Sequence, residues 1–244
     1  MFDVILRACR HPILYSGVRR ITTLTFKEKI HETGDIYSFI FTAANLPSWQ
    51  AGQHSIFTIP ARPVEGKTWR PFSVASSPHE NEIRIGTIVS AEPSSFKHHL
   101  STLNPGDKIR MFGPYGELYI TKKMRHVVGV AGGIGITPFR SIIADLAKNP
   151  TDTKLTLIYS AREGQHAYRG DLEKWREQNP NIEIIYTTTP EEVNAELAKQ
   201  VEAYKNDAHY LLSGPPKMIE ALCSKLSESG IAKDHVLNDP FKGY

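Results

Sequence analysis

The strongest constraint on the fold of this chain is a glycine-rich segment, residues 130–138 (VAGGIGITP). It follows the apolar run 127–131 and precedes a segment with helical periodicity. Glycines let the backbone approach a pyrophosphate, and a helix N-terminus offers unpaired N–H groups and a positive dipole end. We expect Thr137 to cap the helix and Pro138 to lie in its first turn. This order predicts a dinucleotide loop, although a structural tight turn needs similar glycines, and Pro138 stands where the Rossmann fingerprint has its third glycine.

Apolar strands alternate with helices after this point. The expected strands and helices follow one another at residues 127–131, 137–147, 155–159, 170–178, 182–186, 191–204, 209–212 and 217–228. This alternation predicts βαβ units around a buried parallel sheet. A second loop, residues 212–218 (LSGPPKM), lies at the carboxyl end of a predicted strand, where open α/β sheets bind ligands; the alternative is a plain turn made rigid by two prolines.

The first half of the chain has a different pattern. Its β-rich segments are residues 21–26, 36–41, 54–59, 72–75 and 83–89, with a helix at 95–103 and turns at 104–107 and 113–116. Short strands at this spacing predict a closed antiparallel β-barrel. We therefore divide the 244 residues into an N-terminal extension at 1–20, a barrel domain at 21–122 and an α/β domain at 123–244.

Composition excludes several classes of protein. The formal net charge of +3 lacks the large basic field of a nucleic-acid binder. Two cysteines, Cys9 and Cys223, are too few for a disulfide scaffold or a four-thiolate cluster, and they indicate reduced thiols in the cytoplasm. No apolar run is long enough to span a membrane. We expect a cytoplasmic monomer without a metal site, in which residues 1–20 either pack on the barrel or form a basic amphipathic helix.

A short motif in the barrel half combines a cation, an aromatic ring and a hydroxyl. In Arg70-Pro71-Phe72-Ser73, strand geometry puts Arg70 and Phe72 on one side. A guanidinium suits phosphate oxygens, and an aromatic side chain suits a flat ring. On their own, these four residues fit a barrel strand with an exposed arginine and a core phenylalanine better than a ligand site.

The complete set of motifs is more specific. It runs RPFS at 70–73, PSSF at 93–96, PGD at 105–107, GPYG at 113–116, GGIGITP at 132–138, GPPKM at 214–218 and DPFKGY at 239–244. This order resembles the ferredoxin–NADP reductase superfamily, and within it the bacterial stand-alone flavodoxin/ferredoxin reductase-like flavoproteins. The resemblance covers about residues 21–244. It implies FAD in the barrel, NAD(P)H in the α/β domain, and hydride transfer to flavin N5 followed by electron transfer to a separate acceptor.

The resemblance also implies residue roles in the flavin site. Arg70 would hold the FAD pyrophosphate, Phe72 would lie against the isoalloxazine, and Ser73 would hydrogen-bond near N5. Ser94, Ser95 and Phe96 resemble a second phosphate-binding segment. The other expected flavin-binding positions are Pro71, Thr87 and Val89.

Further roles follow for the nicotinamide nucleotide. The resemblance implies that four residues of the glycine loop cradle its pyrophosphate, and that three residues of the second loop border the nicotinamide. These residues are Gly133, Gly135, Thr137 and Pro138, and then Gly214, Pro215 and Met218.

Two positions depart from the family pattern. Ser213 stands where relatives often carry a cysteine, and we expect it to polarise or position the nicotinamide. Asp239 is interpreted equally as a proton relay and as a salt-bridge partner. Phe241 or Tyr244 would cover the flavin ring, and Phe241 is favoured.

The choice between NADPH and NADH depends on the end of the strand at 155–159. Ser160, Arg162, Tyr168 and Arg169 are the expected ribose-binding residues, and no acid stands at the strand end, although Glu163 follows. Because NADPH needs a cation near its 2′-phosphate, this pattern favours NADPH over NADH. The alternative is a solvated arginine face.

The acceptor stays open: a flavodoxin, a ferredoxin, another redox component or a small molecule. Two other functions are compatible with the sequence. The chain could be a flavin-binding sensor or regulatory module without turnover, which the serine at position 213 and the long tail leave room for. It could also be the electron-entry subunit of a larger complex, with residues 1–20 as a docking arm.

Overall fold

A computed structural model describes residues 19–240, which divide between Glu117 and Leu118 into two compact units. Most of the expected N-terminal extension, together with Cys9, Phe241 and Tyr244, lies outside the described residues. The sequence-based boundary at residues 122/123 stays a prediction about the folding domains.

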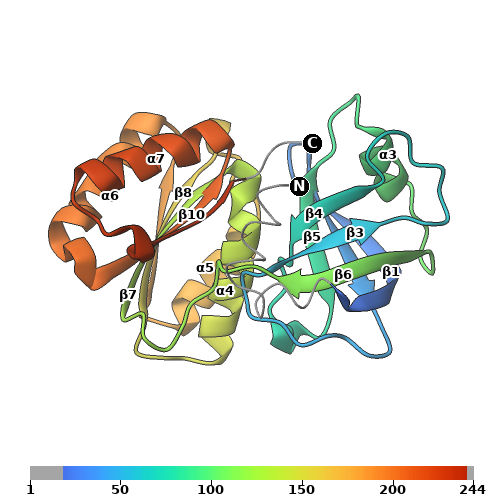
Figure 1. Ribbon diagram of the computed structural model, residues 1–244, viewed down its shortest axis with the longest axis horizontal. Coiled ribbons are helices and arrows are strands. Elements are labelled where there is room, and N and C mark those ends of the chain that lie inside the picture. The colour runs from blue at the N-terminus through green and yellow to red at the C-terminus, as the bar shows by residue number, and fades with distance from the viewer. Residues whose placement is uncertain (1–18, 241–244) are drawn as a thin grey trace. The chain divides into compact units, whose positions relative to one another are not determined.

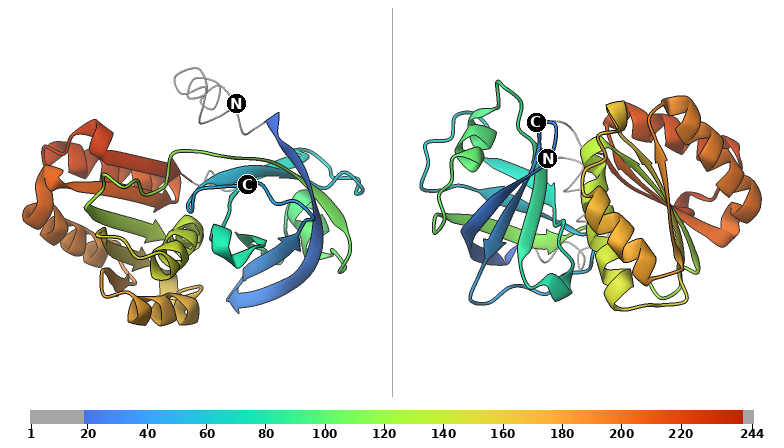
Figure 2. Two further views of the ribbon diagram at one scale, coloured as in Figure 1. Left: turned by 90° about the horizontal axis from the view of Figure 1, so that it is seen from below. Right: turned by 180° about the vertical axis from the view of Figure 1, so that it is seen from behind.

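The first unit is an antiparallel barrel of six strands (Figures 1 and 2). The strands are β1 (Ile21–Thr33), β2 (Ile36–Thr42), β3 (His54–Thr58), β4 (Trp69–Ser73), β5 (Ile83–Ile88) and β6 (Lys108–Tyr115), in the order β4-β3-β6-β1-β2-β5. The chain that follows the edge strand β4 is linked to the other edge strand, β5, because the Ala75 amide donates to the Arg84 carbonyl at 2.7 Å. The predicted antiparallel barrel is therefore confirmed.

Alternation along the strands separates the barrel core from the outer face of the sheet. Phe57 and Phe72 point into the core cluster, whereas the cross-strand partners His54 and Ser73 occupy the other face of β3 and β4. Helix α3 (Ser95–Ser101) buries Phe96 in the same cluster. The core thus joins the strand that carries Arg70 to the helix that follows Ser94.

The predicted turn at residues 113–116 is wrong over most of its length, because β6 continues to Tyr115. The pairing of β3 with β6 shifts register between His54 and Ile56, so the Gly113–Pro114 pair forms an irregularity within the strand. Proline donates no ladder hydrogen bond, and Gly113 has a φ of 132° with Ser55 packed against it. These two residue types mark a strand irregularity here, and the sequence pattern alone suggested a turn.

The second unit is a parallel five-stranded sheet covered by helices on both faces (Figure 1). Its strands are β7 (His126–Gly132), β8 (Lys154–Ser160), β9 (Ile182–Thr187), β10 (Ala208–Gly214) and β11 (Val236–Pro240), in the order β11-β10-β7-β8-β9. Its helices are α4 (Ile136–Lys148), α5 (Arg169–Gln178), α6 (Pro190–Tyr204) and α7 (Pro216–Glu228). The predicted parallel α/β domain is confirmed, and β11 adds an edge strand that the sequence pattern did not indicate.

The strand order reverses direction next to β7. The chain passes outward from β7 to β8 and β9, then crosses back to place β10 on the other side of β7. Such a reversal creates a crevice at the carboxyl ends of the two central strands, the usual ligand position in open α/β sheets. Both glycine-containing loops of the sequence lie at these two strand ends.

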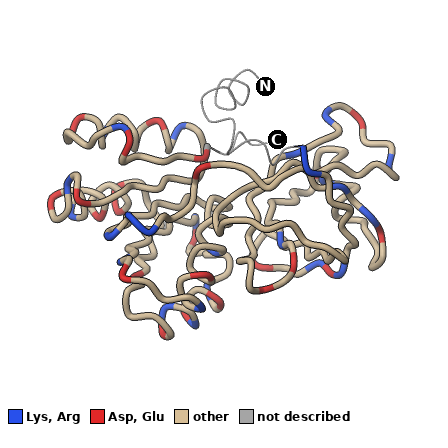
Figure 3. The backbone as a smooth tube through the Cα atoms, turned by 60° about the horizontal axis from the view of Figure 1, so that its bottom comes forward, with Lys and Arg blue, Asp and Glu red and all other residues tan. Residues whose placement is uncertain are grey.

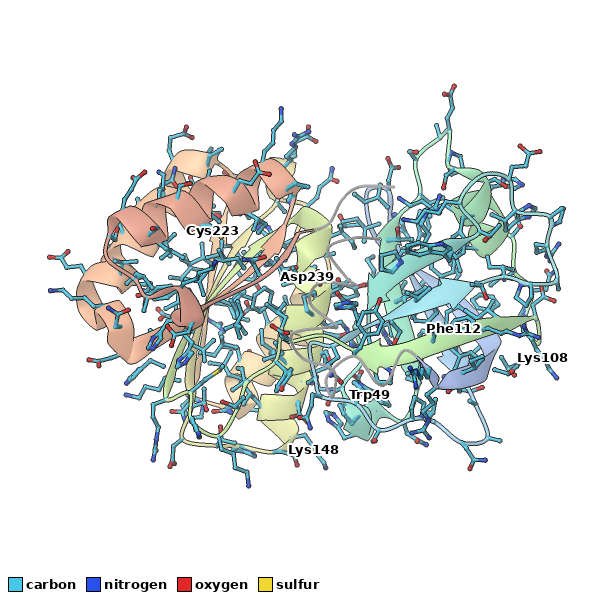
Figure 4. The ribbon with its side chains drawn as sticks, viewed as in Figure 1. Trp49, Lys108, Phe112, Lys148, Cys223 and Asp239 are labelled. Carbon is cyan, nitrogen blue, oxygen red and sulfur yellow. The ribbon has the colours of Figure 1, made fainter. Side chains whose placement is uncertain are left out.

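Charged residues of both signs are interspersed along the chain (Figure 3). No helix within residues 19–240 is both long enough and apolar enough to cross a membrane. Cys223 lies on α7 (Figure 4) and packs against the core, and burial raises the pKa of its thiol.

The contact between α4 and the sheet depends on Gly129 in the centre of β7. A β-carbon at this position would lie 2.6 Å from Cε1 of Phe139 and 3.1 Å from Cδ1 of Leu157. The missing side chain therefore lets α4 lie close to the central strand. Since α4 begins at the glycine-rich loop, this packing also sets the position of that loop.

We predict that Gly129→Ala lowers the free energy of unfolding by about 1–3 kcal/mol, because the added methyl overpacks the contact with Phe139. Denaturant unfolding followed by circular dichroism measures the loss. Gly170→Ala is the matched control, since a β-carbon there meets nothing within 4 Å in α5. The control should be neutral or stabilising by up to about 1 kcal/mol, and equal effects of the two substitutions would contradict the packing argument.

Candidate functional site

Residues from distant segments meet at the carboxyl edge of the parallel sheet. The register pairs Ser213 with Ala131 on one side and with Asp239 on the other. It also pairs Gly132 with Ser160. Figure 4 labels Asp239 near the end of β11. The structure therefore brings Ser160, Ser213 and Asp239 to the same edge as the glycine loop.

The two loops at this edge touch backbone to backbone. A β-carbon on Gly135 would overlap the carbonyl oxygen of Ser213, and one on Gly132 would lie 2.5 Å from Sδ of Met218. A β-carbon on Gly214 would lie 3.2 Å from the Gly132 amide nitrogen. These glycines are needed because the loops after β7 and β10 pack directly against each other.

The other side of the glycine loop is open. Gly133 has a φ of 54°, which favours glycine, and a β-carbon there would meet nothing within 4 Å. The loop forms a short 3-10 turn, Gly133–Gly135, and α4 starts at Ile136. Space beside a glycine backbone suits the close approach of a phosphate group.

The expectation that Thr137 caps α4 is wrong. The helix starts one residue before it, with Gly135 as the N-cap, and the Thr137 hydroxyl donates to the Ile134 carbonyl at 3.0 Å. Within residues 19–240, no side chain accepts a hydrogen bond from this helix end at its cap. The first-turn N–H groups thus keep the capacity to bind an anion.

Two buried hydroxyls at this edge lack hydrogen-bond partners. Neither Ser213 Oγ nor Thr187 Oγ1 has one in the described part of the chain, and both side chains are buried. A buried polar atom without a partner is uncommon and costs stability, so it points to a partner that the protein chain does not supply. Ser213 was predicted from the sequence; Thr187 was not, because only its register partner Ser160 links it to the edge.

The structure separates the four expected ribose-binding residues into two groups. Arg162 and Arg169 are exposed, and Ser160 is half-buried at the end of β8. Tyr168 instead lies in the interior, where the Arg140 guanidinium is 5.4 Å from its ring centre. The exposed pair flanks the loop formed by residues 161–168.

Tyr186 is a neighbour of this group that the sequence pattern did not single out. The Arg169 guanidinium lies 4.5 Å from its ring centre, and Tyr159 is its register partner on β8. Burial and the nearby Glu173 raise the pKa of the Tyr186 phenol, so the side chain stays neutral at physiological pH. Its position one residue before the end of a predicted strand was the only available signal.

In the barrel, Arg70 is a largely buried cation. Its Nη1 donates to the carbonyls of Lys67 and Trp69 at 2.6 and 2.9 Å, and its guanidinium lies 5.4 Å from the Phe96 ring centre. Phe72 also faces Phe96, with ring centres 6.2 Å apart, as the strand alternation predicts. Because Phe72 is only 8% exposed and packs in the core, its flavin contact stays a prediction.

The start of α3 adds a second cation and a buried hydroxyl. Burial and the neighbouring Arg70 lower the pKa of Lys97. The Oγ of Ser94 is buried without a hydrogen-bond partner among residues 19–240, whereas the Oγ of Ser95 accepts from the Glu65 amide at 2.9 Å. Two adjacent cations and an unused hydroxyl are suited to an anionic group. Lys97 was missed as a site residue, because its approach to Arg70 depends on the tertiary fold.

Ser73 has the clearest unused polar atom in the barrel. The residue is 2% exposed, and its Oγ has no hydrogen-bond partner within the described residues. Its face of β4 also carries Pro71, opposite to the face of Phe72. Thr87 is buried in β5, and Val89 follows that strand and packs against the core.

No group of three or more His, Cys, Asp or Glu side chains within residues 19–240 is arranged to hold a metal ion. The predicted flavin-covering residue Phe241 and its alternative Tyr244 lie beyond the described residues.

Comparison with known proteins identifies the second unit. Residues 130–224 match the family described as the oxidoreductase NAD-binding domain. The matched segment begins in β7, contains both glycine loops, and ends in α7. The class defined by fold and site is therefore an oxidoreductase that combines an antiparallel barrel with a nucleotide-binding α/β unit.

Solved structures with the same fold include a ferredoxin–NADP+ reductase from Plasmodium falciparum with 2′P-AMP. Its TM-score is 0.78 at 17% identity, and the match covers 92% of this chain and 97% of that one. The FAD/NAD binding domain of a Vibrio cholerae nitric oxide dioxygenase has a TM-score of 0.75 at 20% identity, covering 90% and 98%. Together with the family match, this fold makes the chain a ferredoxin–NADP reductase-like protein.

Similar curated proteins include one subunit of the Na(+)-translocating NADH-quinone reductases, the same subunit in each organism. The protein from Marinomonas sp. (strain MWYL1) is 29% identical over 205 residues, covering 74% of this chain and 50% of its own length. The Klebsiella pneumoniae protein is 28% identical with the same coverage. The chain spans about half the length of these relatives.

The unused hydroxyl of Ser73 generates a stability prediction for protein freed of bound nucleotides. Ser73→Ala should raise the free energy of unfolding by roughly 1 kcal/mol, because it removes a buried polar atom without a partner. Thermal unfolding followed by calorimetry measures the change.

Ser76→Ala is the matched control, since the Ser76 hydroxyl donates to the Glu82 carbonyl at 2.6 Å and accepts from the Arg84 amide at 2.9 Å. This substitution should destabilise by about 1–3 kcal/mol. A Ser73→Ala protein that loses as much stability as Ser76→Ala would show that Ser73 is a structural residue.

Proposed function

We propose that the chain binds FAD on its barrel and NAD(P)H at the carboxyl edge of its parallel sheet, and that it delivers electrons to a separate acceptor. The observation that carries the proposal is the packing of two glycine loops against each other at the strand-order reversal. One side of this pair is open at Gly133, and Ser213 beside it has an unused hydroxyl. Both belong to the segment that matches an oxidoreductase NAD-binding domain.

The barrel supports the flavin part of the proposal through charge and hydrogen bonding. Arg70 and Lys97 are partly desolvated cations near one another, and Ser94 adds a buried hydroxyl, a combination that suits a pyrophosphate. Ser73 offers a buried hydroxyl for a hydrogen bond at flavin N5. The fold-level likeness to a Vibrio cholerae FAD/NAD binding domain agrees with these residue-level observations.

When both cofactors are bound, hydride passes from nicotinamide C4 to flavin N5, and this chemistry belongs to the cofactors. The protein contributes binding and orientation. Gly133, Gly135 and the start of α4 would hold the nucleotide pyrophosphate, and Ser213 would fix the nicotinamide by a hydrogen bond. Asp239, in register with Ser213, could serve as a proton relay or as a charge partner.

For the nucleotide, we propose NADPH rather than NADH. Arg162 and Arg169 are exposed cations beside the half-buried Ser160, and no carboxylate stands at the end of β8. A 2′-phosphate is recognised by cations, whereas NADH sites usually place an acid against the ribose hydroxyl. The relatives are named as NADH-quinone reductases, which argues for the other nucleotide, so both are compared in the experiment below.

The acceptor is proposed to be a small redox protein such as a flavodoxin or ferredoxin. A specific observation favours a second candidate, namely an electron-entry component of a larger complex. The curated relatives described above are themselves subunits of an NADH-quinone reductase. Because the chain spans about half of their length, this candidate concerns the flavin and nucleotide units alone.

Anaerobic absorbance spectra of the purified protein test the proposal. We expect flavin bands that bleach on addition of NADPH, and more slowly with NADH, because Arg162 and Arg169 favour a 2′-phosphate. Protein purified without flavin is first loaded with FAD and then measured in the same way. Stoichiometric FAD that neither nucleotide bleaches would contradict a reductase and favour a sensor, and faster bleaching by NADH would reverse the nucleotide assignment.

Stopped-flow flavin reduction tests the role of Ser73. Ser73→Ala should keep FAD bound but slow reduction by about tenfold or more, the effect of one lost hydrogen bond to a polarised group. The Ser76→Ala control should reduce its flavin at the wild-type rate, because its hydroxyl is already paired within the barrel. Single-turnover kinetics that stay unchanged in Ser73→Ala would remove Ser73 from the reaction.

A further inference from the structure

The second unit contains a buried arginine that no predicted role uses. Arg140 lies in the second turn of α4, the helix that starts at the glycine loop, and is 1% exposed. Its Nη2 donates to Oδ2 of Asp171 at 2.7 Å, near the start of α5. A buried cation is costly unless it is paired, so its presence in the core calls for an explanation.

The Arg140 guanidinium also lies against two aromatic rings. Its central carbon is 4.9 Å from the ring centre of Trp175 and 5.4 Å from that of Tyr168. Such cation–π contacts are strongest where water is excluded. Arg140 therefore supports the Tyr168 ring through a side chain that belongs to a different helix.

Tyr168 needs such support because of its backbone. Its φ of 61° and ψ of 14° are left-handed, a conformation that residues with side chains adopt rarely. Its side chain is buried, and its carbonyl accepts the first-turn amide of Leu172 at 2.9 Å. The contact with Arg140 helps to keep this unfavourable backbone in place at the end of the loop formed by residues 161–168.

The same loop is fixed from its inner side by His166. The ring Nε2 lies 3.1 Å from the Tyr159 carbonyl and 3.0 Å from the Thr187 carbonyl. The Ala167 amide donates to the Tyr159 hydroxyl at 3.0 Å. The loop is thus anchored to β8, β9 and α4 at its buried end, while Arg162 and Arg169 stand exposed on either side.

We propose that Arg140 is a positioning residue for nucleotide binding. By holding Tyr168 and Asp171, it links the helix that starts at the glycine loop to the loop that carries Arg162 and Arg169. The pyrophosphate-binding and ribose-binding parts of the edge then keep a fixed separation. This inference rests on the proposed function, and it assigns Arg140 no contact with the nucleotide.

A positioning role and a merely structural role have different consequences. Loss of a structural ion pair would lower the stability and leave ligand affinity of the folded fraction unchanged. Loss of positioning would weaken nucleotide binding, yet leave hydride transfer in the saturated complex unchanged, because the nicotinamide end is held by other residues. The ratio between these two effects separates the two roles.

The experiment uses FAD-loaded protein carrying Arg140→Met, which keeps an unbranched apolar stem and removes the guanidinium. Titration calorimetry with NADP+ gives the dissociation constant, and stopped-flow reduction by saturating NADPH gives the limiting rate. We expect binding to weaken by about tenfold, as for one charge-assisted hydrogen bond, and the limiting rate to stay within about twofold. NAD+ and NADH replace these ligands if they are the ones that wild type prefers.

Arg125→Met is the matched control, because it removes an arginine of the same unit whose ion pair with Asp152, at 2.9 Å, is exposed. It should bind and react as wild type. If Arg140→Met does not fold, Tyr168→Asn is used, since asparagine tolerates the left-handed backbone and removes the ring that Arg140 contacts. The same loss of binding is expected.

Unchanged binding in a folded variant would overturn the inference, and so would a limiting rate that falls as much as the affinity. Wild-type protein that binds neither NADP+ nor NAD+ would overturn the proposed function, and the inference with it. Wild type that binds normally, beside variants that also bind normally, would overturn the inference alone.

Discussion

The second unit depends on the direct backbone contact between the loops that follow β7 and β10. No side chain separates them, because the chain has glycine at positions 132, 135 and 214. The helices α4 and α7 start from these loops, so the contact also fixes where two helix N-termini lie. A side chain at Gly135 would meet backbone rather than a flexible neighbour, and backbone has little freedom to move away. The shape of the edge therefore follows from missing atoms as much as from those present.

The barrel and the parallel sheet share a second property, which is polar capacity that the chain itself leaves unused. Ser73, Ser94 and Ser213 each bury a hydroxyl without a partner among residues 19–240, and Lys97 is held beside Arg70. Each feature lowers the stability of the empty protein. Such local conflicts between stability and arrangement are typical of functional sites, and here they concentrate at the motifs that resemble a flavoprotein reductase.

Much of this arrangement could be predicted from sequence periodicity. The alternation of apolar strands and helices predicted the parallel sheet, and short strands with turn residues predicted the barrel. The errors have local causes. Gly113 and Pro114 suggested a turn although they form an irregularity in β6, and the half-exposed edge strand β11 lacks an apolar pattern. Arg140, Lys97 and Tyr186 could not be found, because their significance depends on neighbours from other helices and strands.

The position of β11 has a consequence for synthesis of the protein. β7, at the centre of the sheet, is made early, whereas its neighbour β10 and the edge strand β11 come last in the described chain. Domains generally fold as units while the chain emerges from the ribosome, N-terminal first. The barrel can therefore fold before the sheet is complete, while the glycine loop waits for Ser213 and Asp239. During that interval the apolar edge of β7 is unprotected, which makes the nascent second unit the part most exposed to aggregation and most in need of a chaperone.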